Sequence, residues 1–222
     1  MELLQVENLS VTVGAEALLD SVTFLVESGD YLAVFGPNGA GKTTLIRALL
    51  GLQGLSSGHI YWRGNRTVGY VPQKPEFVSK NFPTTTSEII ASGKIGSTKM
   101  EVSEAAETFG ISSLLKKQFK TLSGGQKQLA MAARSIISKP RLLILDEPMA
   151  GVDIEHSGTY LEKLKSLNLT GTAIIMVTHE LDIIQKEASK VLWLNKKVIF
   201  FGVKDEFLRL AHETHIDQHP HD

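Results

Sequence analysis

The sequence has 222 residues and no cysteine, so disulfides and thiolate metal sites are excluded. It also has no excess of positive charge. Its 23 basic and 24 acidic residues give a formal net charge of −1, and no Lys/Arg-rich run stands out. Charge therefore does not favour nonspecific binding to nucleic acid, and we expect no nucleic-acid partner.

Long apolar runs are missing as well. No window approaches the roughly 18 uninterrupted apolar residues that a membrane span needs. The first ten residues, MELLQVENLS, carry acids where a signal peptide has a basic region. We therefore expect a soluble cytoplasmic protein that works at a membrane only by docking on another protein. Its hydrophobic fraction of 42% suits a globular domain with a sizeable core.

The order of apolar segments indicates an α/β fold. Three strands are expected within residues 1–36, followed by a glycine-rich loop and a helix over 42–50. Beyond residue 123, continuous apolar runs at 141–146 and 173–179 alternate with helical patterns. Buried strands that alternate with helices predict a mainly parallel sheet with helices on both faces, preceded here by an N-terminal antiparallel β part.

Residues 74–122 have few β-branched apolar runs and are expected to form a helical insertion. We expect a loop at 74–83, a helix capped by Ser87, and further helices within 100–110 and 112–119. The whole chain is then one domain. The expected parts are a core of 1–73 and 123–205, the insertion, and a flexible tail of 206–222.

The stretch GPNGAGKTT matches the phosphate-loop pattern of two glycines with four residues between them, then lysine, then serine or threonine. It lies between an expected strand and an expected helix, as phosphate binding requires. Backbone N–H groups of such a loop surround the β- and γ-phosphates, the lysine adds positive charge, and the hydroxyl ligates Mg²⁺. The residues expected to contact the phosphates of ATP are Gly36, Pro37, Asn38, Gly39, Ala40, Gly41, Lys42, Thr43 and Thr44.

Two acids follow a buried apolar strand in RLLILDEP. The strand's carboxyl end presents Asp146 toward a metal ion, so Asp146 joins Thr43 as a candidate ligand of Mg²⁺. Glu147 comes next and is placed to polarise a water that attacks the γ-phosphate. Alone, this strand would more simply end in two solvated acids. The phosphate loop favours the catalytic interpretation.

Two further polar residues end apolar strands. His179 ends the strand in AIIMVTH, where ligands bind in open α/β sheets, and could hydrogen-bond the γ-phosphate. A lone histidine is otherwise more often structural. Gln73 ends the strand in VGYVPQ and is placed to touch Mg²⁺ or the attacking water. It would report that contact to the insertion.

A second anion-binding pattern, TLSGGQKQL, opens a predicted helix at residues 121–129. With this stretch, the phosphate loop, Gln73, LLILDEP, AGVD and His179 in order, residues 1 to about 205 resemble the ATPase subunit of an ATP-binding cassette (ABC) transporter. The resemblance implies a head-to-tail homodimer. It also implies Glu147 as catalytic base, His179 as switch histidine and Asp153 at the dimer seam. The residues implied to contact the partner's ATP are Ser123, Gly124, Gly125 and Gln126.

Two positions depart from the family pattern. The family usually stacks an aromatic residue on adenine where this chain has Val13, so stacking and cation–π contributions would be missing. It also often has arginine where this chain has Leu129, at the end of the signature stretch. We expect hydrolysis to survive both differences.

The insertion resembles that of zinc, manganese and iron importers, especially zinc importers of Gram-positive bacteria. The resemblance implies cytoplasmic attachment to integral membrane permease subunits at the inner face of the membrane, with an extracellular substrate-binding protein as an indirect partner. A groove for a short permease helix would be lined by Phe77, Phe82 and Pro83. The two phenylalanines could instead be core of the insertion.

The tail AHETHIDQHPHD carries four of the seven histidines, and it is expected to be either a solvated end or a zinc-binding segment. The favoured function is ATP hydrolysis that energises a metal-ion importer. Two alternatives remain. One is an ABC ATPase for another imported substrate, a chelate or an organic solute. The other is a regulatory or assembly ATPase outside transport.

Overall fold

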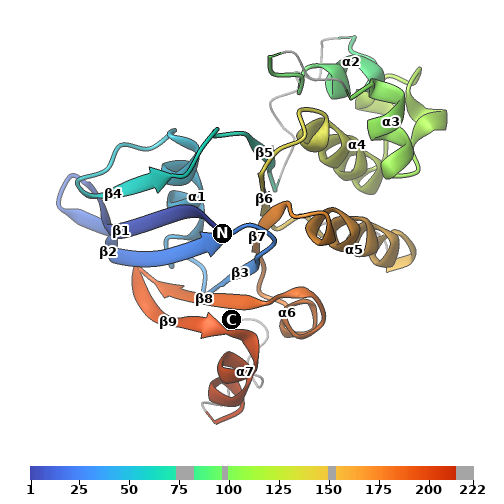
Figure 1. The fold of residues 1–222 in the computed structure, drawn as a ribbon. Coiled ribbons are helices and arrows are strands. Elements are labelled where there is room, and N and C mark those ends of the chain that lie inside the picture. The colour runs from blue at the N-terminus through green and yellow to red at the C-terminus, as the bar shows by residue number, and fades with distance from the viewer. Residues whose placement is uncertain (74–82, 97–99, 150–153, 214–222) are drawn as a thin grey trace. The chain divides into compact units, whose positions relative to one another are not determined.

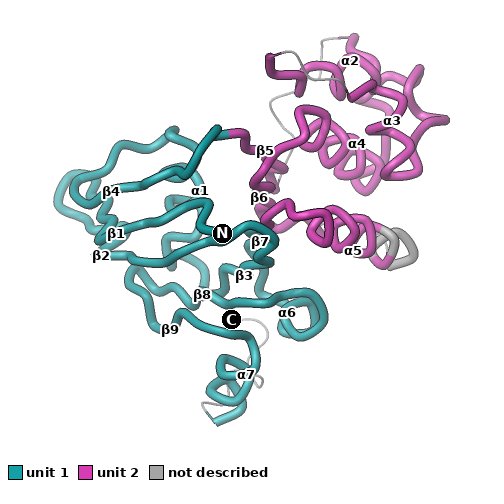
Figure 2. The backbone as a smooth tube through the Cα atoms, in the orientation of Figure 1, with its two compact units in different colours: residues 1–66, 175–222 teal, residues 67–174 magenta. Residues whose placement is uncertain are grey.

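The computed structural model describes residues 1–73, 83–96, 100–149 and 154–213, without the side chains of 154–157 and 159. The chain divides into two compact units, shown in different colours in Figure 2. Unit 1 comprises residues 1–66 and 175–222, and unit 2 comprises residues 67–174. The two units are described separately below.

An antiparallel sheet in the order β2-β1-β4 forms the N-terminal part of unit 1, as Figure 1 shows. Strand β1 (Glu2–Val13) pairs with β2 (Glu16–Glu27) and β4 (Ser57–Trp62). Along β1 the alternate residues Leu4 and Val6 are fully buried, and so are Val26 and Phe24 opposite them, at 0–3% exposure. This alternation is what a sheet with one buried face requires, and it confirms the expected antiparallel part.

The strands that precede and support the phosphate loop are continuous apolar runs, as expected for strands buried on both faces. Strand β3 (Tyr31–Phe35) is buried throughout and pairs in parallel with β8 (Lys190–Asn195). Strand β9 (Lys197–Val203) pairs with β8 in the antiparallel direction. Helix α1 (Lys42–Leu50) begins and ends where the sequence predicts, and Gly51 with a φ of 77° ends it.

In the described residues the larger sheet has the strand order β5-β6-β7-β3-β8-β9. Strands β5 (Val68–Val71) and β6 (Leu142–Asp146) pair in parallel within unit 2. The boundary between the units falls inside β7 (Ala173–Val177). Parallel pairing at β3–β8 and β5–β6, with one antiparallel edge strand, agrees with the mainly parallel sheet that the sequence predicts.

Unit 2 also contains helices α2 (Thr86–Ala91), α3 (Val102–Thr108), α4 (Gly124–Ile136) and α5 (Ile154–Leu169). Helix α4 packs against α2, α3 and β5. The helix expected over 112–119 is absent from this described stretch. Two single 3₁₀ turns, η1 (Ser112–Leu114) and η2 (Phe119–Thr121), stand in its place.

The expected N-cap of α2 was wrong. Thr85, not Ser87, precedes the first helical residue. The Thr85 hydroxyl accepts from the amide of Glu88, and the Glu88 carboxylate accepts from the amide of Thr85. This reciprocal capping box needs a Glu three residues after the cap, a spacing that Thr85 has and Ser87 lacks.

The expected flexible tail over 206–222 was wrong for its first residues. Helix α7 (Lys204–Glu213) follows β9 directly, and α6 (Leu181–Glu187) lies beside it in unit 1. The side chain of Phe207 is fully buried, with its ring 5.4 Å from that of Phe35. An amphipathic turn that buries Phe207 and Ala211 therefore docks α7 on unit 1.

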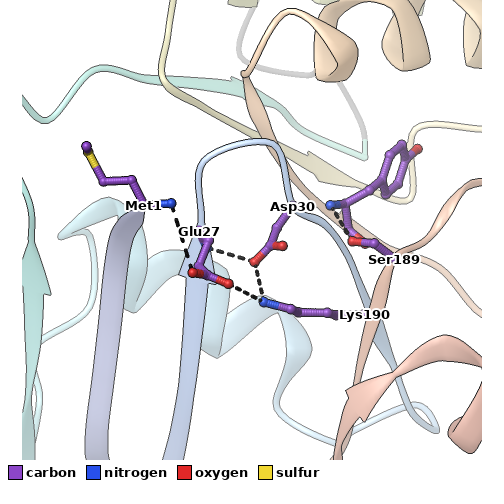
Figure 3. Close-up of polar contacts among 6 residues, drawn as sticks. Met1, Glu27, Asp30, Ser189 and Lys190 are labelled. Carbon is purple, nitrogen blue, oxygen red and sulfur yellow. Dashed lines mark hydrogen bonds and ion pairs between the residues drawn. The ribbon is translucent and has the colours of Figure 1, made fainter.

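An ion cluster joins the turn after β2 to the start of β8. Figure 3 shows the ammonium group of Lys190 between two carboxylates. Its Nζ lies 2.8 Å from Asp30 Oδ2 and 3.0 Å from Glu27 Oε2. Asp30 Oδ2 also accepts from the amide of Glu27 at 2.7 Å. Burial alone would lower the pKa of Lys190, but the hydrogen bonds and charges of these two acids outweigh it and raise the pKa.

No helix in the described parts of the chain is both long and apolar enough to cross a membrane.

Replacing Lys190 with methionine keeps its apolar stem and removes both ion pairs. We expect the free energy of unfolding at pH 7 to fall by about 1–2 kcal/mol, because a poorly exposed Asp30 loses its counter-ion. Urea denaturation measures this change. The control Lys197→Met breaks an exposed pair with Asp20, which solvent screens, and should change the stability much less. Equal losses in the two variants would contradict the importance of the cluster.

The same cluster predicts a pH dependence. The raised pKa of Lys190 means that its contribution is complete below the unfolded value of 10.5 and is lost as pH rises through the higher folded value. The hydrogen bond from Lys190 lowers the pKa of Glu27. That contribution is complete above the unfolded value of 4.5 and is lost as pH falls through the lower folded value. The difference between Lys190→Met and the unaltered chain should therefore shrink at both extremes.

Candidate nucleotide-binding site

The phosphate loop of unit 1 connects β3 to α1. Its lysine bridges the loop from within: Lys42 Nζ donates to the carbonyl oxygens of Gly36 at 2.7 Å and Pro37 at 2.8 Å. The lysine side chain is 8% exposed, whereas Asn38, Gly39 and Thr43 are exposed. The positive charge therefore lies under the loop, and the loop's outer side is open to solvent.

Two glycines of the loop have no room for a side chain. A Cβ on Gly36 would lie 2.1 Å from the carbonyl oxygen of Leu194, and one on Gly41 would lie 2.7 Å from that of Leu18. Both glycines also have positive φ, 154° and 94°. Only glycine combines this backbone conformation with such a close approach. The loop's curvature is thus fixed by β2 and β8 behind it.

The β8–β9 turn supports the loop from the same side. The amide of Lys196 donates to the carbonyl of Ala40 at 2.8 Å, and its own carbonyl accepts from the amide of Asp20 at 2.7 Å. Lys196 itself has a φ of 57°, which is unusual for a residue with a side chain. The sequence analysis missed the contact between Ala40 and Lys196 because these residues are 156 positions apart.

His179 follows β7 at the end nearest the phosphate loop. The amide of Thr178 donates to the carbonyl of Val34 at 3.2 Å, which places the end of β7 beside the end of β3 within unit 1. The Thr178 hydroxyl accepts from the amide of Glu180 at 3.1 Å and so turns the chain there. His179 lies between them and is exposed, as a residue that contacts a bound ligand must be.

In unit 2, β6 delivers the two predicted acids. Its five residues are buried, and Asp146 at its end is 7% exposed. Glu147 follows with a φ of 46°. Left-handed backbone at a residue other than glycine costs about 1–3 kcal/mol and is frequent at functional sites. The sharp turn separates the directions of two consecutive carboxylates.

Gln73 and Glu147 are brought together in unit 2. Gln73 Nε2 donates to Glu147 Oε2 at 2.5 Å, across 74 positions of sequence. Both residues are accessible to solvent. The sequence predicts each of them near the reacting phosphate. It does not predict that the amide would hold the carboxylate.

Helix α4 begins as the signature stretch predicts. Ser123 is the N-cap: its hydroxyl accepts from the amide of Gln126, whose side chain accepts from the amide of Ser123. By helix geometry the amides of Gly124 and Gly125 have no acceptor within the helix. Ser123 and Gly124 are exposed. The helix start therefore presents backbone donors on an accessible surface of unit 2.

The two departures from the family pattern lie in different environments. Leu129 is 7% exposed and belongs to the buried face of α4, so it packs as a core residue. Val13 ends β1 and is 57% exposed. One residue that the sequence analysis missed, Gln128, is 2% exposed and donates to the backbone of Gln73. The sequence signal that could have identified Gln128 is its place directly before a run of apolar helix positions.

Several predicted site residues lie outside the described residues: Phe77, Phe82 and Asp153, together with three tail histidines, 215, 219 and 221. Pro83 is described and exposed, and His212 is exposed on α7. Within the described part of the chain, no three His, Asp or Glu side chains gather as a site for a metal ion.

Known proteins resemble this chain over most of its length. A family model described as ABC transporter matches residues 19–150. The zinc import ATP-binding protein ZnuC of Jannaschia sp. (strain CCS1) is 34% identical over 204 residues, which cover 91% of this chain and 83% of the relative. The zinc uptake system ATP-binding protein ZurA of Listeria innocua is 33% identical over 225 residues, 93% and 88% of the two chains.

Solved structures show the same fold. A nucleotide-free ATP-binding cassette from an ABC transporter has a TM-score of 0.84 at 25% identity and covers 96% of both chains. The chain therefore belongs to the ABC transporter family, in the class of its ATP-binding cassettes. It is an ATPase whose hydrolysis is coupled to transport, and membership implies dimerisation and membrane permease partners.

Gly36→Ala should weaken ATP binding by about tenfold or more, because the new Cβ meets the Leu194 carbonyl and forces the loop out of shape. Calorimetric titration with ATP measures the effect. Gly54→Ala is the control, since its Cβ would meet nothing within 4 Å. Unchanged affinity in Gly36→Ala would contradict the constraint on the loop.

Proposed function

We propose that this chain is the ATP-hydrolysing subunit of a metal-ion importer, with zinc as the first candidate and manganese or iron next. Two observations support ATP hydrolysis. Lys42 bridges the phosphate loop, and the Glu147 carboxylate is held by Gln73. The relatives named for zinc import and zinc uptake, at 33–34% identity, support the cargo.

Nucleotide binding would exchange hydrogen bonds at Lys42. Its ammonium group now donates to two loop carbonyls. A triphosphate offers oxygens with far more negative charge, and charge-assisted bonds to them are the stronger ones. The backbone amides of the loop and of the first turn of α1 would complete the cradle, from Gly36 to Thr44. His179, exposed beside the same loop, would contact the γ-phosphate.

Hydrolysis requires a water aligned with the γ-phosphate. Glu147 would orient that water and accept its proton, as its position at the end of β6 suggests. The bond from Gln73 to Glu147 Oε2 restricts the carboxylate's rotation, and Oε1 would face the water. Catalysis of this kind consists of positioning and electrostatics.

The donor set suits Mg²⁺, which prefers carboxylate, hydroxyl, amide and phosphate oxygens. Asp146, Thr43 and Gln73 would hold it with the phosphate oxygens. Asp146 is nine-tenths buried at the end of β6, and Thr43 is exposed in the first turn of α1. When bound, the ion neutralises charge that develops on the phosphates.

A second copy of this chain would complete each nucleotide site. The capped start of α4, with Ser123 to Gln126, would contact the ATP held by the partner's phosphate loop. Asp153 is proposed at the seam between the copies. Closing around two nucleotides and reopening after hydrolysis would be the working cycle.

The cycle would act on two permease subunits from the inner face of the membrane. A short permease helix would dock on the groove assigned to Phe77, Phe82 and Pro83. A substrate-binding protein outside the cell would deliver the metal to the permease. The cargo never touches this chain in such a system, so relatives, not site geometry, support the choice of zinc.

Glu147→Gln should abolish ATP hydrolysis and preserve ATP binding, because the amide keeps the side chain's shape and cannot accept a proton. The variant should accumulate as an ATP-bound dimer in size-exclusion chromatography. Glu162→Gln, an exposed acid on α5, is the control and should turn over normally. Full activity of Glu147→Gln would remove Glu147 from its role.

A strain that lacks this chain should grow poorly under zinc limitation and recover when zinc or the unaltered chain is supplied. Manganese limitation is the matched condition, and growth there should be unaffected. Recovery with manganese alone would identify manganese, not zinc, as the transported ion. No association with a polytopic membrane protein in detergent extracts would contradict transport and favour a regulatory or assembly role.

A further inference from the structure

Gln128 is a buried polar residue in the middle of unit 2. It lies on α4, five positions after the Ser123 cap, and is 2% exposed. Its Nε2 donates to the backbone carbonyl of Gln73 at 3.0 Å. Gln73 lies two residues beyond the end of β5, where the sheet no longer holds the chain. Gln128 therefore anchors the main chain of the residue that holds Glu147.

This anchor is costly to the fold. The other amide atom, Gln128 Oε1, is buried and has no hydrogen-bond partner among the described residues. A buried oxygen without a donor loses its hydration and gains nothing in return. The carbonyl of Gln73 belongs to an exposed residue, so water could replace the amide there. An apolar side chain of similar length would suit position 128 better for stability alone.

Two hydrogen bonds in series then connect α4 to the carboxylate of Glu147. The first joins Gln128 to the Gln73 main chain, and the second joins the Gln73 side chain to Glu147. The same helix carries Ser123 at its start. A shift of α4 that follows contact between Ser123 and a phosphate would therefore move the group that orients Glu147.

We infer that Gln128 is a positioning residue for ATP hydrolysis: it sets the Gln73 backbone so that the Gln73 amide holds Glu147 for the attacking water. The inference rests on the proposed ATPase function and adds a residue to it. In this role Gln128 would act through Gln73 and would not itself contact the nucleotide or the attacking water. It ties the state of the signature helix to the state of the catalytic base.

The test replaces Gln128 with methionine, and in a second variant with leucine, and measures steady-state hydrolysis of ATP by the purified chain. We expect kcat to fall about tenfold, because a small misplacement of a catalytic group has effects of this size. The KM for ATP should stay unchanged, since the substitution alters neither the phosphate loop nor Ser123 to Gln126 at the start of α4. The thermal unfolding midpoint should stay unchanged or rise, because the unsatisfied oxygen is removed.

The control is Ser135→Ala, which also replaces a buried polar residue of α4. Its hydroxyl donates to the carbonyl of Ala132 within the same helix. Its kcat should equal that of the unaltered chain. A double variant separates positioning from general damage. In a Gln73→Ala background, Gln128→Met should lower kcat no further, because residues that act in series are not additive.

Three results would overturn the inference: unchanged kcat in both apolar variants, a lowered unfolding midpoint that matches the loss of activity, or a full additional loss in the Gln73→Ala background. These results are distinct from failure of the proposed function. An unaltered chain that binds ATP and never hydrolyses it would overturn both proposals. Hydrolysis without metal uptake would overturn only the importer.

Discussion

Close contact between backbones at the phosphate loop is the constraint on which the site depends. At Gly36 and Gly41 the chain passes so near to the Leu194 and Leu18 carbonyls that a single Cβ would not fit. The loop can therefore curve tightly, present its amides outward and keep the Lys42 ammonium beneath them. Because β2 and the β8–β9 turn supply the opposing wall, the antiparallel strands of unit 1 position the loop as well as fill the core.

The acidic half of the site depends on side-chain hydrogen bonds. Strand β6 fixes Asp146 by burial, whereas Glu147 leaves the strand in a left-handed conformation and is held by the Gln73 amide. That amide depends in turn on Gln128. The Gln128 oxygen finds no donor in the described parts of the chain, which lowers stability, and proteins tolerate such losses where function depends on them. Helix α4, which carries Gln128, also begins at the signature residue Ser123. In the proposed mechanism one helix therefore connects the contact with the partner's nucleotide to the positioning of Glu147.

Local sequence patterns predicted most of the fold because each pattern reflects interactions between residues that are close in the sequence. The phosphate loop requires a strand before it and a helix after it, and both appear with nearly the expected bounds. The N-cap of α2 was also encoded, since only Thr85 lies three residues before Glu88. Helix α7 was missed because residues 206–222 were assigned to a histidine-rich tail. The helical spacing of Phe207 and Ala211 was not considered.

Contacts between distant positions could not be predicted in this way. The Gln73–Glu147 and Gln128–Gln73 bonds span 74 and 55 positions, and no local propensity specifies them. The family pattern identified Gln73 and Glu147 separately. Leu129, which departs from that pattern, became intelligible only when its burial was known.

The central claim is that one copy of this chain holds a nucleotide and needs the signature helix of a second copy to hydrolyse it. The most direct measurement is the rate of ATP hydrolysis per chain as a function of protein concentration, for the purified chain at saturating ATP. The account predicts a rate per chain that rises with concentration and then levels off as dimers form. A constant rate per chain, from dilute monomer upward, would contradict it.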